Sequence, residues 1–326
     1  MSVKIGILGG GVAGSLLYML LRGVGQQVDL YDLKDKYFKP CGDIVPNVYT
    51  PPFPWKVDVE VKNFAFYLDG ELMYDVDYRY PKWLVIDKWG WINSMRSITK
   101  LSRTYDGNYD VTIDARGPYP MDREVVYTTR AIVKTGSQLD RAIFEFDSKL
   151  TGFYWVFPAA EGTINVGAGF LEERNSRRAL LDYMKTKLGE YELKDLRGAP
   201  ISVGEVGNRK LKVGEARGLV FPMSGEGIRP SAISAEVAFE ALTKEKEFDQ
   251  FLEERLGWLD NRIRIQRILL SIYRGSPPHL RRTMLRALIK SDVLIDAYLD
   301  DKLDLNGILD AVRLTRSGAF TGKLKK

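Results

Sequence analysis

Short apolar runs and glycine-rich turns alternate through the first forty residues, a pattern typical of a β-turn-α-β unit. Residues 4–8, apolar from Ile5 onward, predict a short buried strand, and residues 15–22 form a largely apolar segment of helical length. A second strand is predicted over residues 27–32. Four glycines interrupt the apolar stretch between positions 9 and 14, which favours a strand, turn and helix over a signal peptide or a membrane-spanning helix.

The remaining chain divides into a β-rich middle and a helical end. Asp69-Gly70 predicts a tight hairpin turn, and β-branched and aromatic residues are frequent over residues 121–170, as in an antiparallel sheet. Further strands are predicted over residues 60–68, 72–76, 82–87 and 110–114. Helices are predicted over residues 89–100, 175–188, 230–242 and 246–326.

The turn after the first predicted strand carries a dinucleotide-binding fingerprint. Gly9 permits the tight turn, Gly11 lets the backbone approach a pyrophosphate, and Gly14 lets the helix pack closely on the strand. The helix N-terminus offers free N–H groups to the phosphates. Asp32 lies 18 residues beyond Gly14, where a ribose-binding carboxylate is expected, and it would repel a 2′-phosphate. FAD or NAD therefore fits this site better than NADP.

Composition and charge narrow the chemistry. The chain has 326 residues, of which 45% are hydrophobic, with a net charge of +5, as in ordinary globular proteins of about two domains. The mildly basic balance permits an anionic partner, but we expect no nucleic acid. One cysteine and one histidine exclude an internal disulfide and most cysteine- or histidine-based metal sites, so no metal is expected. We expect a cytoplasmic protein.

Three further segments are candidates for function. The only cysteine, Cys41, lies in a polar loop over residues 39–43, where a nearby cation would favour the thiolate; an inert cysteine is the alternative. Residues 153–157 hold four aromatics, so one strand face can line a cavity while the other packs. Residues 262–290 hold eight basic and no acidic residues among apolar ones, which indicates either a membrane-surface or anion-binding face or a solvated helical face.

Four of these features, in this order, resemble the FAD-dependent geranylgeranyl reductase family, a branch of the flavoproteins with the p-hydroxybenzoate hydroxylase fold. The resemblance covers roughly residues 3–240. Its motifs are the glycine fingerprint with Asp32 and the segments 39–42 (KPCG), 152–158 (GFYWVFP) and 221–228 (FPMSGEGI).

The resemblance implies an α/β fold in which a Rossmann-like FAD-binding domain carries an inserted antiparallel β-sheet substrate domain and a C-terminal helical region. The FAD-binding domain would comprise residues 1–58, 83–120 and 206–245. The substrate domain would comprise residues 59–82 and 121–205, and the helical region residues 246–326.

The implied activity is that of a flavin-dependent oxidoreductase, which would reduce isolated double bonds of geranylgeranyl or other isoprenoid lipid chains by hydride transfer from reduced FAD. The chain has no second glycine fingerprint, so the electron donor is left open between NAD(P)H and another reductant. The basic segment 262–290 would allow peripheral membrane contact, and the oligomeric state is not indicated. The alternatives are an aromatic hydroxylase or halogenase-like monooxygenase on the same fold, or a flavin- and lipid-binding protein without turnover.

The resemblance also assigns roles to individual residues. Cys41 would lie at the reacting face of the flavin, where it gates the site or donates a proton. Two cofactor positions depart from the family pattern: Glu215 stands where an aspartate is usual, and Lys88 where an arginine is frequent. The substrate wall would be formed by Tyr154, Trp155, Phe157 and Pro158. The residues expected to contact FAD are Gly9, Gly11, Val12, Ala13, Gly14, Asp32, Lys39, Pro40, Gly42, Lys88, Asp114, Ala115, Gly214, Glu215, Gly225, Gly227 and Ile228.

Overall fold

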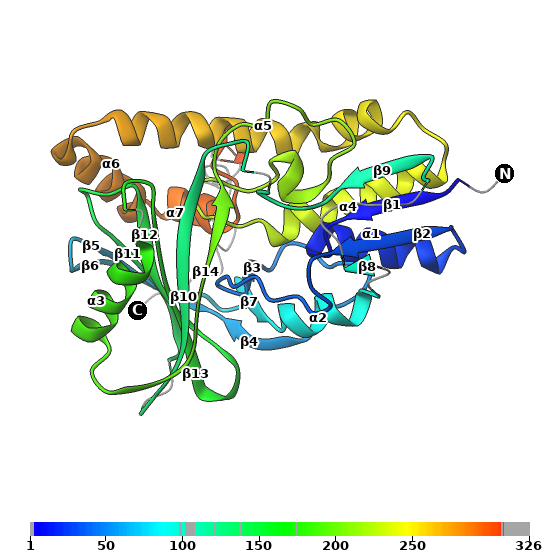
Figure 1. Cartoon of the computed structure of the whole chain (residues 1–326). Coiled ribbons are helices and arrows are strands. Elements are labelled where there is room, and N and C mark those ends of the chain that lie inside the picture. Colours follow the sequence, from blue (N-terminus) through cyan, green and yellow to red (C-terminus); the bar gives the residue numbers. More distant parts are fainter. Residues whose placement is uncertain are drawn as a thin grey trace.

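The β-turn-α-β unit predicted at the N-terminus is present in the computed structural model (Figure 1). β1 (Ile5–Leu8) leads through the glycine turn into α1 (Val12–Gly23), and β2 (Val28–Asp32) returns parallel to β1. The structure describes residues 3–97, 100–101, 108–119, 121–136, 139–173, 175–307 and 309.

A four-stranded parallel sheet forms the nucleotide-binding part of the molecule. Its order is β8 (Lys100–Leu101), β2, β1 and β9 (Val111–Asp114). β1 is the strand at which the order changes: β2, which follows β1 in the chain, pairs with one edge of β1, and β9 pairs with its other edge. The strand order therefore reverses next to the glycine turn, at the position where open α/β sheets bind their ligands.

The helix predicted over residues 89–100 is shorter than expected. α2 spans Lys88–Met95; the Asp87 carboxylate caps its start by accepting from Gly90 N at 2.8 Å. Arg96 has an extended backbone, so the helix ends there, and β8 follows at Lys100.

A seven-stranded sheet forms the second part of the molecule and confirms the predicted β-rich insertion. Asp69 and Gly70 both have positive φ, as a two-residue type I′ hairpin turn requires. The sheet is antiparallel except that β11 and β5 run parallel, so it is not the purely antiparallel sheet that we predicted. Its strands in order are β14 (Tyr191–Ser202), β10 (Val125–Thr135), β13 (Thr163–Phe170), β12 (Gly152–Pro158), β11 (Arg141–Phe146), β5 (Asn63–Leu68) and β6 (Glu71–Asp77).

A small three-stranded sheet connects the two parts. It consists of β3 (Ile44–Pro46), β7 (Trp83–Ile86) and β4 (Val57–Val61), and it combines segments from both sides of the domain boundaries expected near residues 58 and 82. Some of its buried side chains, such as Trp83 and Val85, pack into the same apolar cluster as one face of the seven-stranded sheet, whereas Val45 and Ile86 pack into the core of the nucleotide-binding part.

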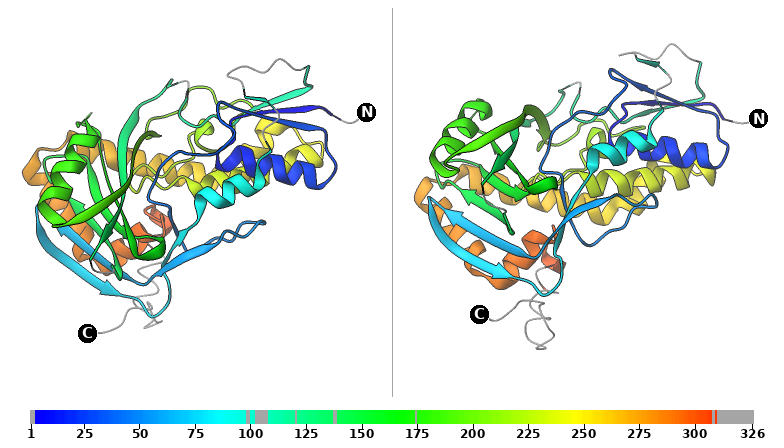
Figure 2. Two further views of the ribbon diagram at one scale, coloured as in Figure 1. Left: turned by 60° about the horizontal axis from the view of Figure 1, so that its bottom comes forward. Right: turned by 90° about the horizontal axis from the view of Figure 1, so that it is seen from below.

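Helices cover both parts, and one of them extends across the molecule. α1 packs against α4 (Ile228–Thr243) beside the parallel sheet, and α3 (Ser176–Lys187), predicted over residues 175–188, covers one face of the seven-stranded sheet. α5 (Phe248–Gly275) runs from the nucleotide-binding part to the far end of the sheet (Figures 1 and 2). The remaining elements are α6 (Pro278–Lys290), α7 (Asp292–Leu299) and the short helices η1 (Ala160–Gly162) and η2 (Gly214–Arg217).

The predicted C-terminal helical region is confirmed over α5, α6 and α7. Its last part, from residue 310 onward, lies outside the described residues. α6 and α7 pack on the face of the seven-stranded sheet opposite α3. Apolar side chains of β5, β11 and β12 thus face helices on that side, and this side also borders the cavity described next.

Candidate active site

A continuous cavity of about 1080 Å³ extends from the glycine turn to the seven-stranded sheet. Its lining includes Gly9, Gly11 and Asp32 at one end and Phe153 and Trp155 at the other. Small-molecule pockets usually measure about 300–1,000 Å³, so this cavity is large enough for a long ligand or for two ligands together.

The glycine turn shapes the nucleotide end of the cavity. Gly9 has φ +104°, a backbone conformation that side chains disfavour. A Cβ on Gly14 would lie 1.9 Å from the Gly9 carbonyl oxygen, whereas a Cβ on Gly11 would meet nothing within 4 Å. Gly14 therefore packs the helix on the turn, as predicted, without lining the cavity, and Gly11 leaves open space before the first turn of α1. No side chain caps α1, so its first N–H groups remain available to an anion.

Asp32 and Arg96 fix the turn from the other side. The Asp32 carboxylate accepts from Gly10 N at 2.8 Å and from Arg96 Nη2 at 3.1 Å, and Arg96 Nη1 donates to the Gly10 carbonyl at 3.0 Å. Both residues line the cavity. Asp32 lies where we predicted a ribose-binding acid. Arg96 was not predicted, because a lone basic residue after a helix carries no spacing signal.

The loop that contains Cys41 forms a compact, partly buried cluster with Lys88. Lys88 Nζ lies 2.6 Å from Cys41 Sγ and 2.9 Å from Asp43 Oδ1, and the Cys41 thiol donates to Asp43 at 3.0 Å. Burial and the Asp43 carboxylate raise the pKa of Cys41 to about 11, although Lys88 opposes them. The raised pKa favours the thiol over the thiolate that a nearby cation alone would favour. A cation is present, but desolvation outweighs its effect.

Lys88 lines the cavity, but its ammonium group already contacts several groups of this loop. Its side chain is only 3% exposed, and its ammonium also donates to the Lys39 carbonyl at 3.2 Å. Its predicted contact with the cofactor would therefore compete with the contacts it makes to the loop.

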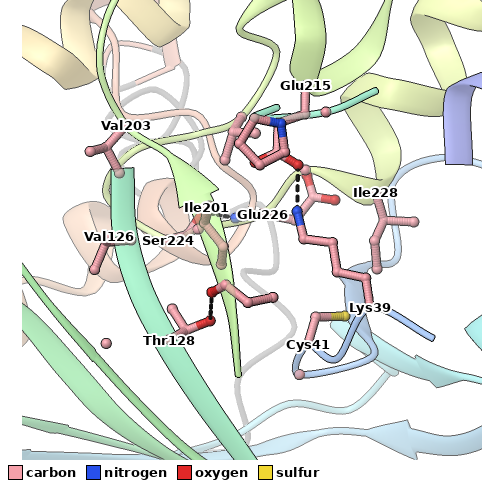
Figure 3. Close-up of a pocket in the computed structure, with 18 of the residues that line it drawn as sticks. Lys39, Cys41, Val126, Thr128, Ile201, Val203, Glu215, Ser224, Glu226 and Ile228 are labelled. Atoms are coloured by element: carbon pink, nitrogen blue, oxygen red, sulfur yellow. Dashed lines mark hydrogen bonds and ion pairs between the residues drawn. The ribbon is translucent and has the colours of Figure 1, made fainter. Parts of the chain in front are cut away.

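Glu215 bridges two segments at the middle of the cavity. It forms an ion pair with Lys39 at 2.7 Å and accepts from Ser202 N at 2.8 Å. Figure 3 shows the Lys39–Glu215 pair beside Cys41 around the hollow. The extra methylene of Glu215, relative to aspartate, thus serves a contact with the loop.

Most predicted cofactor residues line this cavity, and three do not. Gly14 packs on the turn as described above. The Asp114 carboxylate forms an ion pair with Arg116, in which Nη2 and Oδ2 are 2.9 Å apart. Gly214 packs against α1, where an added Cβ would lie 2.7 Å from the Ala13 Cβ. The predicted residues that line the cavity are Gly9, Gly11, Val12, Ala13, Asp32, Lys39, Pro40, Gly42, Lys88, Ala115, Glu215, Gly225, Gly227 and Ile228.

The aromatic strand β12 contributes one face to the cavity. Phe153, Trp155 and Phe157 line it, whereas Tyr154 and Pro158 do not. Tyr154 stacks on Tyr183 of α3 with ring centroids 4.3 Å apart. Successive side chains of a strand point to opposite faces, so the predicted set mixed two faces. The prediction that Tyr154 and Pro158 line the cavity was wrong, and Phe153 is a lining residue that was not predicted.

Hydrogen bonds tie this aromatic wall to the cysteine loop. Trp155 Nε1 donates to Asn165 Oδ1 at 3.0 Å, and Asn165 Nδ2 donates to the Cys41 carbonyl at 2.9 Å. Trp155 lies against Gly167, where an added Cβ would come within 1.9 Å of the ring. The strand and the loop therefore hold each other in position.

The C-terminal helices supply a third wall. Tyr273 of α5, Leu285 and Leu288 of α6, and Tyr298 of α7 line the cavity. These residues were not predicted as site residues, because apolar positions on amphipathic helices are indistinguishable from ordinary core positions in the sequence.

Comparisons with known proteins give partial sequence matches. No protein-family model matches the chain. A digeranylgeranylglycerophospholipid reductase 2 of Methanothermobacter thermautotrophicus is 34% identical over 122 residues, which are 33% of this chain and 32% of that protein. The corresponding protein of Methanopyrus kandleri is 30% identical over 121 residues, covering 31% of each chain. The chain thus matches about a third of the length of these curated relatives.

Solved structures match over nearly the whole chain. A geranylgeranyl bacteriochlorophyll reductase-like protein of Thermoplasma acidophilum superposes with a TM-score of 0.71 at 16% identity, covering 98% of this chain and 97% of its own. The p-nitrophenol 4-monooxygenase PnpA of Pseudomonas putida gives 0.65 at 17% identity, covering 94% and 98%. The flavin-dependent brominase Bmp2 gives 0.66 at 12% identity, covering 97% and 99%. In fold over nearly its whole length, and in sequence over a third of it, the chain resembles the FAD-dependent geranylgeranyl reductase family.

Proposed function

We propose that this protein is a flavin-dependent oxidoreductase that binds FAD and reduces isolated carbon–carbon double bonds of an isoprenoid lipid. The observation that carries the proposal is the continuous cavity, which joins a dinucleotide-type glycine turn to an aromatic wall. The named relatives support the substrate class, because they are digeranylgeranylglycerophospholipid reductases.

The residues at the nucleotide end fit FAD. Open space at Gly11 and the uncapped start of α1 suit a diphosphate, and Asp32 suits a ribose without a 2′-phosphate. The Lys39–Glu215 pair and the turn at Gly225 and Gly227 would flank the flavin. When bound and reduced, FAD supplies the hydride that none of the standard side chains can provide.

The sheet end fits an apolar chain. Phe153, Trp155 and Phe157 face the apolar side chains of α5 to α7 across the cavity. An isolated alkene has no polar group that could form a hydrogen bond with the protein. Burial against these walls must therefore hold and orient it. The aromatic faces would also stabilise positive charge that develops on the alkene.

Cys41 is the proposed catalytic side chain on the loop. Lys88 and Asp43 hold it as a neutral thiol on the cavity wall. There it either controls the access of the substrate to the flavin or donates a proton to the substrate. We expect Cys41→Ala and Cys41→Ser to lower alkene reduction at least tenfold while FAD stays bound. Unchanged alkene reduction by a flavin-loaded Cys41→Ala variant would exclude this role.

A monooxygenase is the second candidate, favoured by the fold shared with the p-nitrophenol 4-monooxygenase PnpA. The two functions differ in their products. We expect the purified protein to show a bound-flavin spectrum and, when reduced without oxygen, to add two hydrogens per double bond to a geranylgeranyl lipid, as measured by mass spectrometry. Product that requires oxygen and gains an oxygen atom would favour the monooxygenase.

The α5–α6 hairpin is the proposed contact with a membrane surface. Ile268 and Ile272 are each 54% exposed, and Arg264 and Arg286 are exposed on the same two helices. Other side chains of these helices line the cavity, so a lipid could pass from the surface inward. Among the described residues, no helix is both long and apolar enough to cross a bilayer. We propose a peripheral contact because the exposed isoleucines and arginines of these two helices could lie at the membrane surface.

A further inference from the structure

Three charged side chains are buried together where α4 begins, at the turn between Gly225 and Gly227. Glu226, Arg229 and Asp301 are 7%, 5% and 1% exposed. Arg229 Nη2 donates to Asp301 Oδ2 at 3.0 Å, and Arg229 N donates to Glu226 Oε1 at 2.7 Å. Arg229 Nε also lies 3.6 Å from Glu226 Oε2. Two carboxylates thus share one guanidinium.

The groups around this cluster do not balance its charge. Ser224 donates its hydroxyl to Asp301 Oδ1 at 2.6 Å, which is a neutral contact. Asp300 adds negative charge beside Asp301, and it is paired with Lys82 at 2.8 Å and Lys302 at 3.5 Å. With both acids ionised, the cluster would carry one uncompensated buried negative charge, which is costly in a low-dielectric environment.

Binding one proton removes this excess charge. Burial raises the pKa of Glu226, and burial raises the pKa of Asp301 to about 7 even though Arg229 opposes the shift. Burial also raises the pKa of the adjacent Tyr298, so its phenol stays neutral. Both pKa shifts therefore favour the retention of a proton on this buried pair of acids.

The acidic side of the cluster borders the cavity. Glu226 and Ser224 line it, and Figure 3 shows both around the hollow that Cys41 also borders. Among the described residues, Glu226 Oε2 has no hydrogen-bond partner, and neither has the buried hydroxyl of Tyr298, another lining residue. A buried acid oxygen without a hydrogen-bond partner thus lies beneath the wall that Glu226 helps to form.

We propose that Glu226 is the acid that protonates the substrate, with Arg229 and Asp301 as positioning residues; this rests on the proposed function. The O–H bond of the Glu226 carboxyl group breaks and a C–H bond forms at one alkene carbon. The second C–H bond takes its hydride, and thus both electrons, from the reduced cofactor. Arg229 stabilises the resulting carboxylate, and solvent returns the proton before the next turnover.

Glu226 is better suited to this role than Cys41. General acids work best when their pKa lies near the working pH, and the thiol has a pKa of about 11. Of the two roles proposed above for Cys41, gating therefore remains with Cys41, and protonation passes to Glu226.

The test compares Glu226→Gln and Asp301→Asn with Glu236→Gln, a matched change on α4 that lies outside the cavity. The first readout needs no substrate. We expect infrared spectra of the wild-type holoenzyme at neutral pH to show a protonated carboxyl band that Glu226→Gln removes or shifts and Glu236→Gln leaves unchanged. A wild type without such a band would overturn the inference.

The second readout is single-turnover reduction of a geranylgeranyl lipid by dithionite-reduced protein without oxygen. We expect Glu226→Gln to retain FAD and its reduction by dithionite but to slow the lipid step about 100-fold or more. Asp301→Asn should displace the pH profile of that step. A Glu226→Gln variant as fast as wild type would overturn the inference. If wild type reduces no isoprenoid, the proposed function fails, and the infrared band alone decides whether Glu226 holds the proton.

Discussion

Two glycines on the nucleotide turn have separate tasks, although they lie three positions apart in one motif. Gly14 touches the Gly9 carbonyl oxygen with no room for a Cβ, so it serves packing. Gly11 faces open space with φ −81°, a value that any residue adopts, so folding alone does not require glycine there. The fold explains the first glycine, and the proposed cofactor would explain the second.

Valine substitutions test this division directly. We expect Gly11→Val to keep the melting temperature of the cofactor-free protein, because its side chain enters the cavity, and to lose FAD binding. Gly14→Val should lower the melting temperature markedly or prevent folding, because its Cβ would overlap the Gly9 carbonyl oxygen. Thermal melts and flavin absorbance measure the two effects. A Gly11→Val variant that binds FAD normally would contradict the placement of the cofactor.

Individual site residues differ in how far the sequence reveals them. The glycine turn and Asp32 were predictable, because a local motif fixes both their spacing and their chemistry. The Arg229–Asp301 contact was not, since 72 residues separate its partners. The protonation of Cys41 was not predictable either, because it depends on how deeply the fold buries the thiol.

At the scale of elements, β12 shows what a pattern of aromatics can predict. The sequence indicated that one face of this strand could line a cavity, but it did not indicate which face. That choice is made by α3, which covers Tyr154, and by α6 and α7 on the other side. The sequence of β12 does not reveal which helices cover its two faces, and for this reason Phe153 was not predicted as a lining residue.

The link between β12, β13 and the cysteine loop makes a testable contribution to stability. We expect Asn165→Ala to lower the free energy of unfolding by about 1–3 kcal/mol, because it leaves Trp155 Nε1 without its acceptor and removes the donor to the Cys41 carbonyl. Denaturant unfolding measures the change. The exposed Asn261→Ala is the control and should have little effect. Equal stability of the two variants would contradict the link.

The contact between α4 and the segment after α7 predicts a pH dependence. The folded-state pKa of Asp301 is raised from 3.8 to about 7, so the folded protein binds this proton more tightly than the unfolded chain. The stability from this group is fully present below about pH 4 and is lost as the pH rises through 7. Asp301→Asn lacks this titration. We expect the unfolding free energy of wild type minus that of Asp301→Asn to fall between pH 4 and 7; a flat or rising difference would contradict the raised pKa.

At the scale of the whole molecule, the cavity exists only because distant segments meet. The parallel sheet, the seven-stranded sheet and the C-terminal helices each supply one wall. The sequence predicted the order of these parts, since hydrophobic periodicity and glycine motifs are local signals. It did not predict that α5 to α7 line the cavity, because their inward apolar residues look like ordinary core.

The α5–α6 surface predicts binding to anionic membranes. We expect the protein to bind vesicles of phosphatidylglycerol better than vesicles of phosphatidylcholine, and less well at high salt. The double variant Ile268→Ser with Ile272→Ser should bind several-fold less in a sedimentation assay, because it removes exposed apolar area. Leu72→Ser with Leu193→Ser, two similarly exposed residues elsewhere, is the control. Equal loss in both double variants would contradict this placement.

The central claim is that one cavity places reduced flavin and an isoprenoid double bond together. The most direct measurement reduces the purified holoenzyme with dithionite without oxygen, adds a geranylgeranyl lipid, and follows the flavin absorbance by stopped flow. We predict that the flavin reoxidises in step with the formation of saturated product, and that a saturated lipid of equal length leaves the flavin reduced. A flavin that stays reduced with the unsaturated lipid and reoxidises only when oxygen is admitted would contradict the account.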